Sequence, residues 1–221
     1  MTKNQINIRT AVRITENEVF INKKPLQIDA VSEDWLTSIY KKLKISYPKF
    51  FKMDNLCKAG FLAAELCAKE CGLEAREEGN PNWSVAVFNQ TSSLDNDQAY
   101  QKTIEDPQNY FPSPSIFVYT LSNIVTGEIT IRHKLKGESC SYILPKFDAQ
   151  MIEETGRICL EQKGIDNLLI GWVEYLDGKC DVLMFHLTTG STTNEPESWD
   201  LHSINNFFFK FAKQGESLKN N

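Results

Sequence analysis

The apolar positions at the start of the chain recur with a period of two. They alternate loosely with polar residues from Ile6 to Ile28, and the polar run Asn22-Lys23-Lys24 interrupts the alternation. This pattern predicts a pair of strands.

Two segments with helical spacing follow. Ser32, Glu33 and Asp34 favour the start of a helix whose apolar residues share one side: Trp35, Leu36, Ile39 and Leu43. A longer helix is predicted from Asp54 to Cys71, and Gly72 is a natural stop. Small residues make this second helix slim, which suits close packing against a sheet or another helix: Ala59, Gly60, Ala63 and Ala64.

Short apolar runs bounded by turn residues predict the central strands. Trp83 to Phe88 follows the turn Asn80-Pro81-Asn82 and has the composition of a buried strand. Three further strands are predicted: Ser139 to Leu144, Leu168 to Val173 and Cys180 to Leu187. Asp177-Gly178 predicts a hairpin between the last two of them.

The remaining segments are predicted as helices or left open. A helix from Phe147 to Lys163 would carry Asp148 near its positive end and one apolar stripe: Phe147, Met151, Thr155 and Ile158. Ser115 to Lys136 fits both helix and strand, and Gly127 weakens both unless backbones approach closely there. A last helix is expected to pack its apolar residues before a frayed tail: Ile204, Phe207, Phe208 and Phe211.

Strands that alternate with helices predict an α/β layered domain with a mixed sheet and packed helices. The chain has 221 residues, which is long enough for one sizeable core, and we identify no internal repeat or linker. We therefore expect a single domain.

Composition narrows the classes of partner. The 24 basic and 29 acidic residues give a net charge of -5, with no excess or cluster of basic residues of the kind that binds nucleic acid. No apolar stretch approaches the roughly 20 residues of a membrane span, and the first ten residues lack the apolar core of a signal peptide, so we expect a cytoplasmic protein. The six cysteines are expected to be reduced thiols, because no metal-ligand spacing accompanies them, and we expect no metal or cofactor.

A polar loop directly after the strand at Trp83 to Phe88 has two interpretations. Thr91-Ser92-Ser93 would place hydroxyls and backbone donors at the carboxyl end of a strand, where they can line a ligand crevice. A plain surface loop is the alternative.

From Ser113 onward the chain resembles the N-terminal half of a β-ketoacyl synthase, a member of the thiolase-like superfamily. The resemblance extends over residues 52–187 and rests on the ungapped spacing of family motif positions: Ser113, Pro114, Asn123, Gly127, Gly137, Gly171 and Glu174. It implies one ketosynthase-like N-terminal domain over residues 1–221. Residues 1–51 would add strands and a helix, and residues 188–221 a C-terminal extension.

In that family a strand leads into a tight elbow that carries a nucleophilic cysteine at the start of a helix. The helix N-terminus favours the thiolate, which accepts an acyl chain from an acyl carrier protein. The resemblance places Lys146 at the nucleophile position, after Pro145. Lysine is protonated near neutrality unless strongly desolvated, so loss of condensation chemistry is expected. Cys140 lies inside the predicted strand and is expected to be structural.

The family's two catalytic histidines come from a C-terminal half that this chain lacks. His133, His186 and His202 match no family motif, and no chemistry is assigned to them. No catalytic residue is therefore predicted.

The resemblance narrows to short, chain-length-factor-like proteins of aryl polyene and flexirubin pigment clusters. It implies a non-catalytic subunit that pairs with a full-length ketosynthase, or with itself, and meets an acyl carrier protein. Two alternatives stay open: a residual acyltransferase or thioesterase acting through Cys140 or Lys146, and a module that binds the carrier protein or an acyl chain without a ketosynthase. The missing half also predicts a large exposed apolar surface, which a partner or the phenylalanines near residue 208 would cover.

Overall fold

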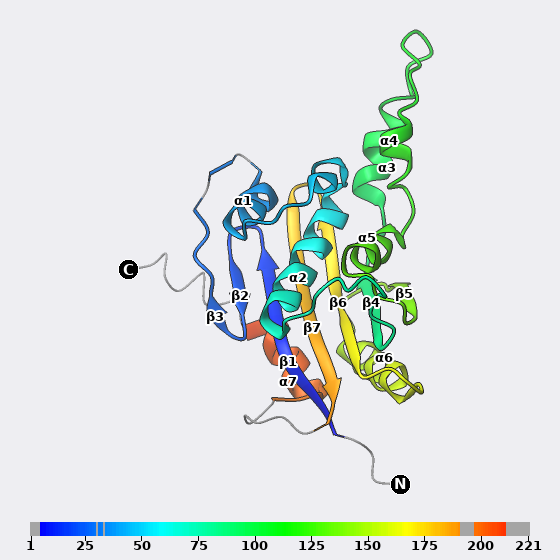
Figure 1. Cartoon of the computed structure of the whole chain (residues 1–221). Helices are drawn as coiled ribbons and strands as arrows, with labels where there is room; N and C mark the ends of the chain where they lie inside the picture. The colour runs from blue at the N-terminus through cyan, green and yellow to red at the C-terminus, as the bar shows by residue number, and fades with distance from the viewer. Residues whose placement is uncertain (1–4, 30, 33, 191–196, 211–221) are drawn as a thin grey trace.

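A single mixed sheet organises the protein (Figure 1). The computed structural model describes residues 5–29, 31–32, 34–190 and 197–210. Within these residues the strand order is β3-β2-β1-β7-β6-β4-β5, and β8 pairs with β1. The strands are β1 (Ile6–Thr15), β2 (Val19–Ile21), β3 (Lys24–Pro25), β4 (Trp83–Asn89), β5 (Ser139–Ile143), β6 (Asn167–Leu176), β7 (Lys179–Thr189) and β8 (Glu197–Ser198). The predicted mixed sheet with packed helices is confirmed.

The antiparallel part of the sheet forms from local turns. β1 pairs with β2, and the predicted hairpin of β6 and β7 closes between Leu176 and Lys179. Asp177 and Gly178 both have positive φ, 50° and 81°, which is the backbone of the tight turn that matches strand twist. The predicted strand pair at the N-terminus and this hairpin are confirmed.

The parallel part of the sheet positions the candidate site. β4 lies between β5 and β6 and runs parallel to both. The connection from β4 leads outward to β5, and the next connection returns to β6 on the other side of β4. The carboxyl end of β4 is therefore the point at which the chain changes direction across the sheet, where open α/β sheets bind their ligands.

Helices of the chain cover both faces of the sheet (Figure 1). The first face packs against α1 (Trp35–Lys42), the 3₁₀ turn η1 (Pro48–Lys52), α2 (Asn55–Cys71) and α5 (Ile124–His133). The second face packs against α6 (Ala149–Glu161), α7 (Leu201–Asn205) and the π-helical turn η2 (Asn206–Lys210). The short helices α3 (Leu94–Gln101) and α4 (Pro114–Phe117) lie beyond the sheet, beside α5.

The helix α2 is buried along most of its length, as its small residues predict. Asp54 caps its start by accepting from the Cys57 amide at 3.0 Å, and Gly72 ends it at a φ of 69°. A Cβ added at Gly60 would lie 2.5 Å from Val125 of α5 and 3.3 Å from Val173 of β6. The slim face therefore packs closely against both a helix and the sheet.

The ambiguous segment after residue 112 forms the helices α4 and α5. Ser113 caps α4 by accepting from the Ile116 amide at 3.4 Å, and α5 buries Val125 and Ile129. Gly127 lies inside α5, where an added Cβ would meet no atom within 4 Å outside its own helix. Close backbone approach is therefore not the reason for this glycine.

The predicted apolar stripe at α6 is only partly confirmed: Thr155 is buried and Phe147 packs against the second face, but the other two members are exposed. Met151 and Ile158 are 41% and 63% exposed. The buried face is formed instead by smaller residues and two aliphatic ones: Ala149, Ile152, Thr155, Gly156, Cys159 and Leu160. This face allows α6 to approach the sheet and the Trp199 ring, which a Cβ at Gly156 would meet at 2.7 Å.

The last predicted helix is present as α7 and η2. Ile204 and Phe207 are buried in the core of the second face, and Phe208 packs against its margin. Phe211 and the tail lie outside the described residues. The C-terminal segment therefore covers part of the second sheet face. Of the two covers expected for an exposed apolar surface, a partner or the chain's own phenylalanines, this is the second.

Two further observations concern the cysteines and the possibility of a membrane span. All six cysteines are free thiols. No helix in the described ranges is long and apolar enough to cross a membrane.

Candidate functional site

The elbow between β5 and α6 lies beside the carboxyl end of β4. β5 pairs with β4 in parallel, and the Leu144 amide then donates to the Asn89 carbonyl at 2.8 Å. Phe147 turns inward and stacks on Phe208 with ring centroids 3.6 Å apart. These contacts fix both ends of the elbow, and Lys146 between them is exposed.

The positive end of α6 is already occupied by a side chain of the chain. The Asp148 carboxylate accepts from the backbone amides of Gln150 and Met151, both at 3.0 Å. The helix starts at Ala149, so Lys146 precedes the cap instead of standing on it. The amides and dipole that would stabilise an anionic nucleophile at this elbow therefore serve Asp148.

The loop after β4 is held by Glu174, one of the motif positions. Its carboxylate accepts from the amides of Gln90 at 2.6 Å and Thr91 at 3.2 Å, and also from the Thr91 hydroxyl. The Ser93 hydroxyl lies 3.1 Å from both the Asp97 carboxylate and the Thr120 carbonyl. Because the hydroxyls of Thr91 and Ser93, two of the three in residues 91–93, bind protein groups, the plain-loop interpretation is the better supported of the two.

Two of the glycines named by the resemblance lie directly against the backbone of a neighbouring strand. A Cβ at Gly137 would lie 2.4 Å from the Trp83 carbonyl oxygen, and one at Gly171 would lie 2.0 Å from the Leu183 carbonyl oxygen. Asn123 precedes α5 without a side-chain cap, and its carbonyl accepts from the Thr126 hydroxyl at 2.7 Å. These motif positions therefore shape the sheet and its connections.

Cys140 and the three histidines lie on separate elements. Cys140, on β5, is half-buried and packs against the core of the second face. His186 of β7 is buried, stacks on Trp83 and lies 2.9 Å from Asn167 through its Nε2 atom. Burial, together with the positive charge of Arg9, lowers the pKa of His186 to about 4. His202 of α7 is exposed.

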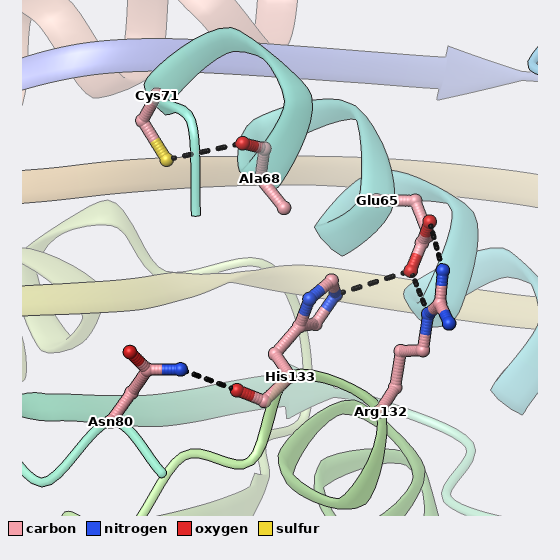
Figure 2. A network of polar contacts seen from close by, with 6 residues as sticks. All are labelled: Glu65, Ala68, Cys71, Asn80, Arg132 and His133. Atoms are coloured by element: carbon pink, nitrogen blue, oxygen red, sulfur yellow. Dashed lines mark hydrogen bonds and ion pairs between the residues drawn. The ribbon is translucent and has the colours of Figure 1, made fainter. Parts of the chain in front are cut away.

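The third histidine belongs to a polar network that the sequence reasoning missed (Figure 2). Glu65 of α2 accepts from the Arg132 Nε and Nη2 atoms at 2.6 and 3.2 Å, and its Oε1 atom lies 3.4 Å from His133 Nε2. Burial lowers the pKa of His133 to about 4; the neighbouring Glu65 opposes this shift and Arg132 adds to it. Charged residues of opposite sign, one on a predicted helix and one in the segment left open between helix and strand, were the signal available, but their pairing depends on how α5 packs on α2.

A second buried network was also missed. Glu128 of α5 is 4% exposed, accepts from the Tyr119 hydroxyl at 3.1 Å and pairs with Lys49 at 2.8 Å. Burial, and then the charge of Glu128, raise the pKa of Tyr119. The network joins η1, α5 and the segment before α5, and it is distant in sequence from the elbow.

Comparison with known proteins gives matches at the level of structure. No family model and no curated protein matches the sequence. The ishigamide ketosynthase/chain length factor matches with a TM-score of 0.64 and 13% identity over 88% of this chain and 64% of that one. The type II polyketide synthase complex AntDE:AntF, an acyl carrier protein with its ketosynthase, matches with a TM-score of 0.57 and 10% identity. This match covers 85% of this chain and 63% of that one.

A third match has a length close to that of this chain. The complex of the ketosynthase ApeO with its chain length factor ApeC from Xenorhabdus doucetiae gives a TM-score of 0.55 and 10% identity, over 95% of this chain and 92% of that one. The chain therefore spans less than two thirds of the first two matched proteins and nearly all of the third. With the strand order and helix layers described above, these matches show that the chain has the thiolase-like α/β fold of ketosynthases and chain length factors.

Proposed function

We propose that this protein is a non-catalytic, chain-length-factor-like subunit that pairs with an active ketosynthase. The observation that carries the proposal is the elbow, where the ketosynthase fold is kept, Lys146 is exposed and Asp148 occupies the helix N-terminus. Two of the matched structures are complexes of a ketosynthase, one with its chain length factor and one with an acyl carrier protein, which supports partners of the same kinds. Elongation of an aryl polyene-type chain is the reaction that we propose the pair serves.

The edge of the sheet at β5 supports a protein partner. β5 pairs with β4 on one side, and among the described strands it ends the sheet. Its Ile143 is 55% exposed, and α5 beside it presents Ile131 at 61% exposure. An unpaired edge with exposed apolar side chains is a surface that proteins normally cover.

The short helices near this edge add further apolar surface. Five large side chains between α3 and α5 are more than half exposed: Tyr110, Phe111, Phe117, Val118 and Leu121. The Ser141 hydroxyl of β5 donates to the Ser122 carbonyl at 3.0 Å, which ties this segment to the edge strand. We name the exposed residues of this segment, with Ile131 and Ile143, the β5 edge surface. The exposure of these apolar side chains supports a partner that covers this edge.

Co-expression tests the partner. We expect the chain to co-purify with a full-length ketosynthase that is expressed together with it, and light scattering to give the mass of a heterodimer. Ile143→Lys should weaken this association at least a hundredfold, because it places a charge in an apolar interface at a position that is already exposed in the single chain. Leu201→Lys on α7 is the matched control and should leave association unchanged. If the chain remains monomeric with every ketosynthase tested, the proposal is wrong.

A restored cysteine should not restore chemistry. Lys146→Cys is expected to give no condensation product with carrier-bound acyl and malonyl thioesters in the absence of a partner. Its thiol pKa, measured from the pH dependence of alkylation, should not fall below the ordinary value of about 8.5, because Asp148 holds the helix amides and adds a negative charge. Lys146→Gln corrects for the native thiols. Persistent acylation lost in Cys140→Ala would instead support the residual acyltransferase.

A further inference from the structure

A pocket lies on the first sheet face, away from the elbow, between the segment after α1, the C-terminal half of α2 and the end of α5. Its volume is about 330 Å³, which is within the usual range for small-ligand sites. Its floor holds Glu65 and His133 of the network in Figure 2. Leu43, Ile45 and Leu73 form apolar, half-buried walls.

The side chains of the pocket carry an excess of positive charge. Arg132 and Glu65 neutralise each other, and His133 is neutral at pH 7 because its pKa lies near 4. Lys44 and Lys69 also line the pocket, and both are exposed. Two positive charges therefore remain uncompensated among the lining residues of a protein whose net charge is -5.

The guanidinium of Arg132 is held in place by contacts that use only some of its N–H donors. Among the described residues Glu65 takes its Nε and Nη2 atoms, and the group lies 5.0 Å over the Tyr47 ring. A guanidinium has five N–H donors, so further donors remain for a ligand. This fixed orientation reduces the cost of ordering the side chain when a ligand binds.

The walls of the pocket are also fixed by buried hydrogen bonds. The Asn80 amide, which is 3% exposed, donates to the carbonyls of Glu74 and His133, each at 2.8 Å. It thereby joins the end of α5 to the wall at residues 73–75. On the opposite side the Tyr47 amide donates to the Tyr40 hydroxyl at 2.8 Å, which fixes the segment after α1. The pocket is therefore largely preformed.

From this arrangement we propose that the pocket binds a small organic carboxylate with a short apolar body. Lys44, Lys69 and the spare donors of Arg132 would hold the carboxylate, and the apolar body would lie on Leu43, Ile45 and Leu73. The apolar walls favour an anion with an apolar body over a compact one such as phosphate, which would leave Leu43, Ile45 and Leu73 uncovered. The inference does not rest on the proposed ketosynthase partnership, since the pocket is built by α2, α5 and the segment after α1.

Titration of the full chain with benzoate tests the proposal. We expect saturable chemical-shift changes at the backbone amides of residues 43–46 and of Arg132, with a Kd of about 1 mM or lower. The double variant Lys44→Gln/Lys69→Gln should raise this Kd at least tenfold, and since both side chains are exposed the variant should fold normally. Lys163→Gln, an exposed lysine just after α6 on the other sheet face, is the matched control and should change the Kd less than twofold.

Three outcomes would overturn the proposal. The first is the absence of saturation with benzoate at about 20 mM, well above a millimolar Kd. The second is an equal weakening by Lys163→Gln, which would indicate non-specific attraction. The third is that inorganic phosphate binds as tightly as benzoate, which would mean that the apolar body of the ligand contributes nothing to binding.

Discussion

Gly171→Ala should cost the protein about 4 kcal/mol or more of its free energy of unfolding. The new Cβ would lie 2.0 Å from the Leu183 carbonyl oxygen and 2.7 Å from the Met184 Cα atom, both backbone atoms of β7. Neither can move without separating β6 from β7, whose pairing runs from Asn167 to Leu176. Losses of this size are exceptional for single substitutions and are a large part of the 5 to 15 kcal/mol typical of a domain.

Gly127→Ala is the matched control because it makes the same change at another motif glycine. An added Cβ at this position in α5 meets no atom within 4 Å outside the helix, so alanine should stabilise the protein by about 0.5–1 kcal/mol through helix propensity. Urea unfolding of both variants measures the difference. A Gly171→Ala protein within about 1 kcal/mol of the wild type would contradict the close approach of the two strands.

The contrast between these glycines shows what the sequence could and could not predict. The resemblance to ketosynthases predicts a motif position at each of them, and spacing alone assigns them equal weight. Local signals predicted the elements that depend on neighbouring residues, such as the hairpin at Asp177-Gly178 and the helix ended by Gly72. Whether a glycine is needed for close packing depends on strands that are distant in sequence, so only the structure separates Gly171 from Gly127.

The helix α6 shows why an apolar period can indicate the wrong face. Met151 and Ile158 suggest the stripe, but the helix packs the side on which Ala149, Gly156 and Cys159 lie among its buried aliphatic residues, because small residues allow closer approach. Met151 and Ile158 are left exposed. The choice depended on Trp199, which fills the space above Gly156 and lies far along the chain.

For the candidate site, too, the sequence predicted a position along the chain but not the contacts made there. Spacing from Gly137 and Glu174 predicts the elbow at Lys146, and the acidic Asp148 is favourable near a helix start; the structure has the connection between β5 and α6 at these residues. The structure adds that Asp148 accepts from two helix amides and that Glu174 clamps the loop at Thr91. These contacts join residues from different elements, which no local pattern encodes.

Trp199→Ala should destabilise the protein by about 3–5 kcal/mol, since the ring is 2% exposed and its removal leaves a large cavity. The indole Nε1 donates to the Glu153 carbonyl at 3.0 Å, and the ring meets Phe185 edge-on with centroids 5.2 Å apart. The substitution also leaves the Glu153 carbonyl without its indole donor. A thermal melt should show a fall of about 10 °C for a chain of this length.

The matched control for Trp199 lies in the same C-terminal segment. Phe209 is 55% exposed, so Phe209→Ala should change stability by less than about 1 kcal/mol. If Trp199→Ala proves equally mild, the segment does not hold the second sheet face closed. If the expected loss is found, the chain covers this face with its own residues 197–210. The β5 edge surface then remains the surface that we propose for the partner, and Ile143→Lys there should weaken association without lowering stability.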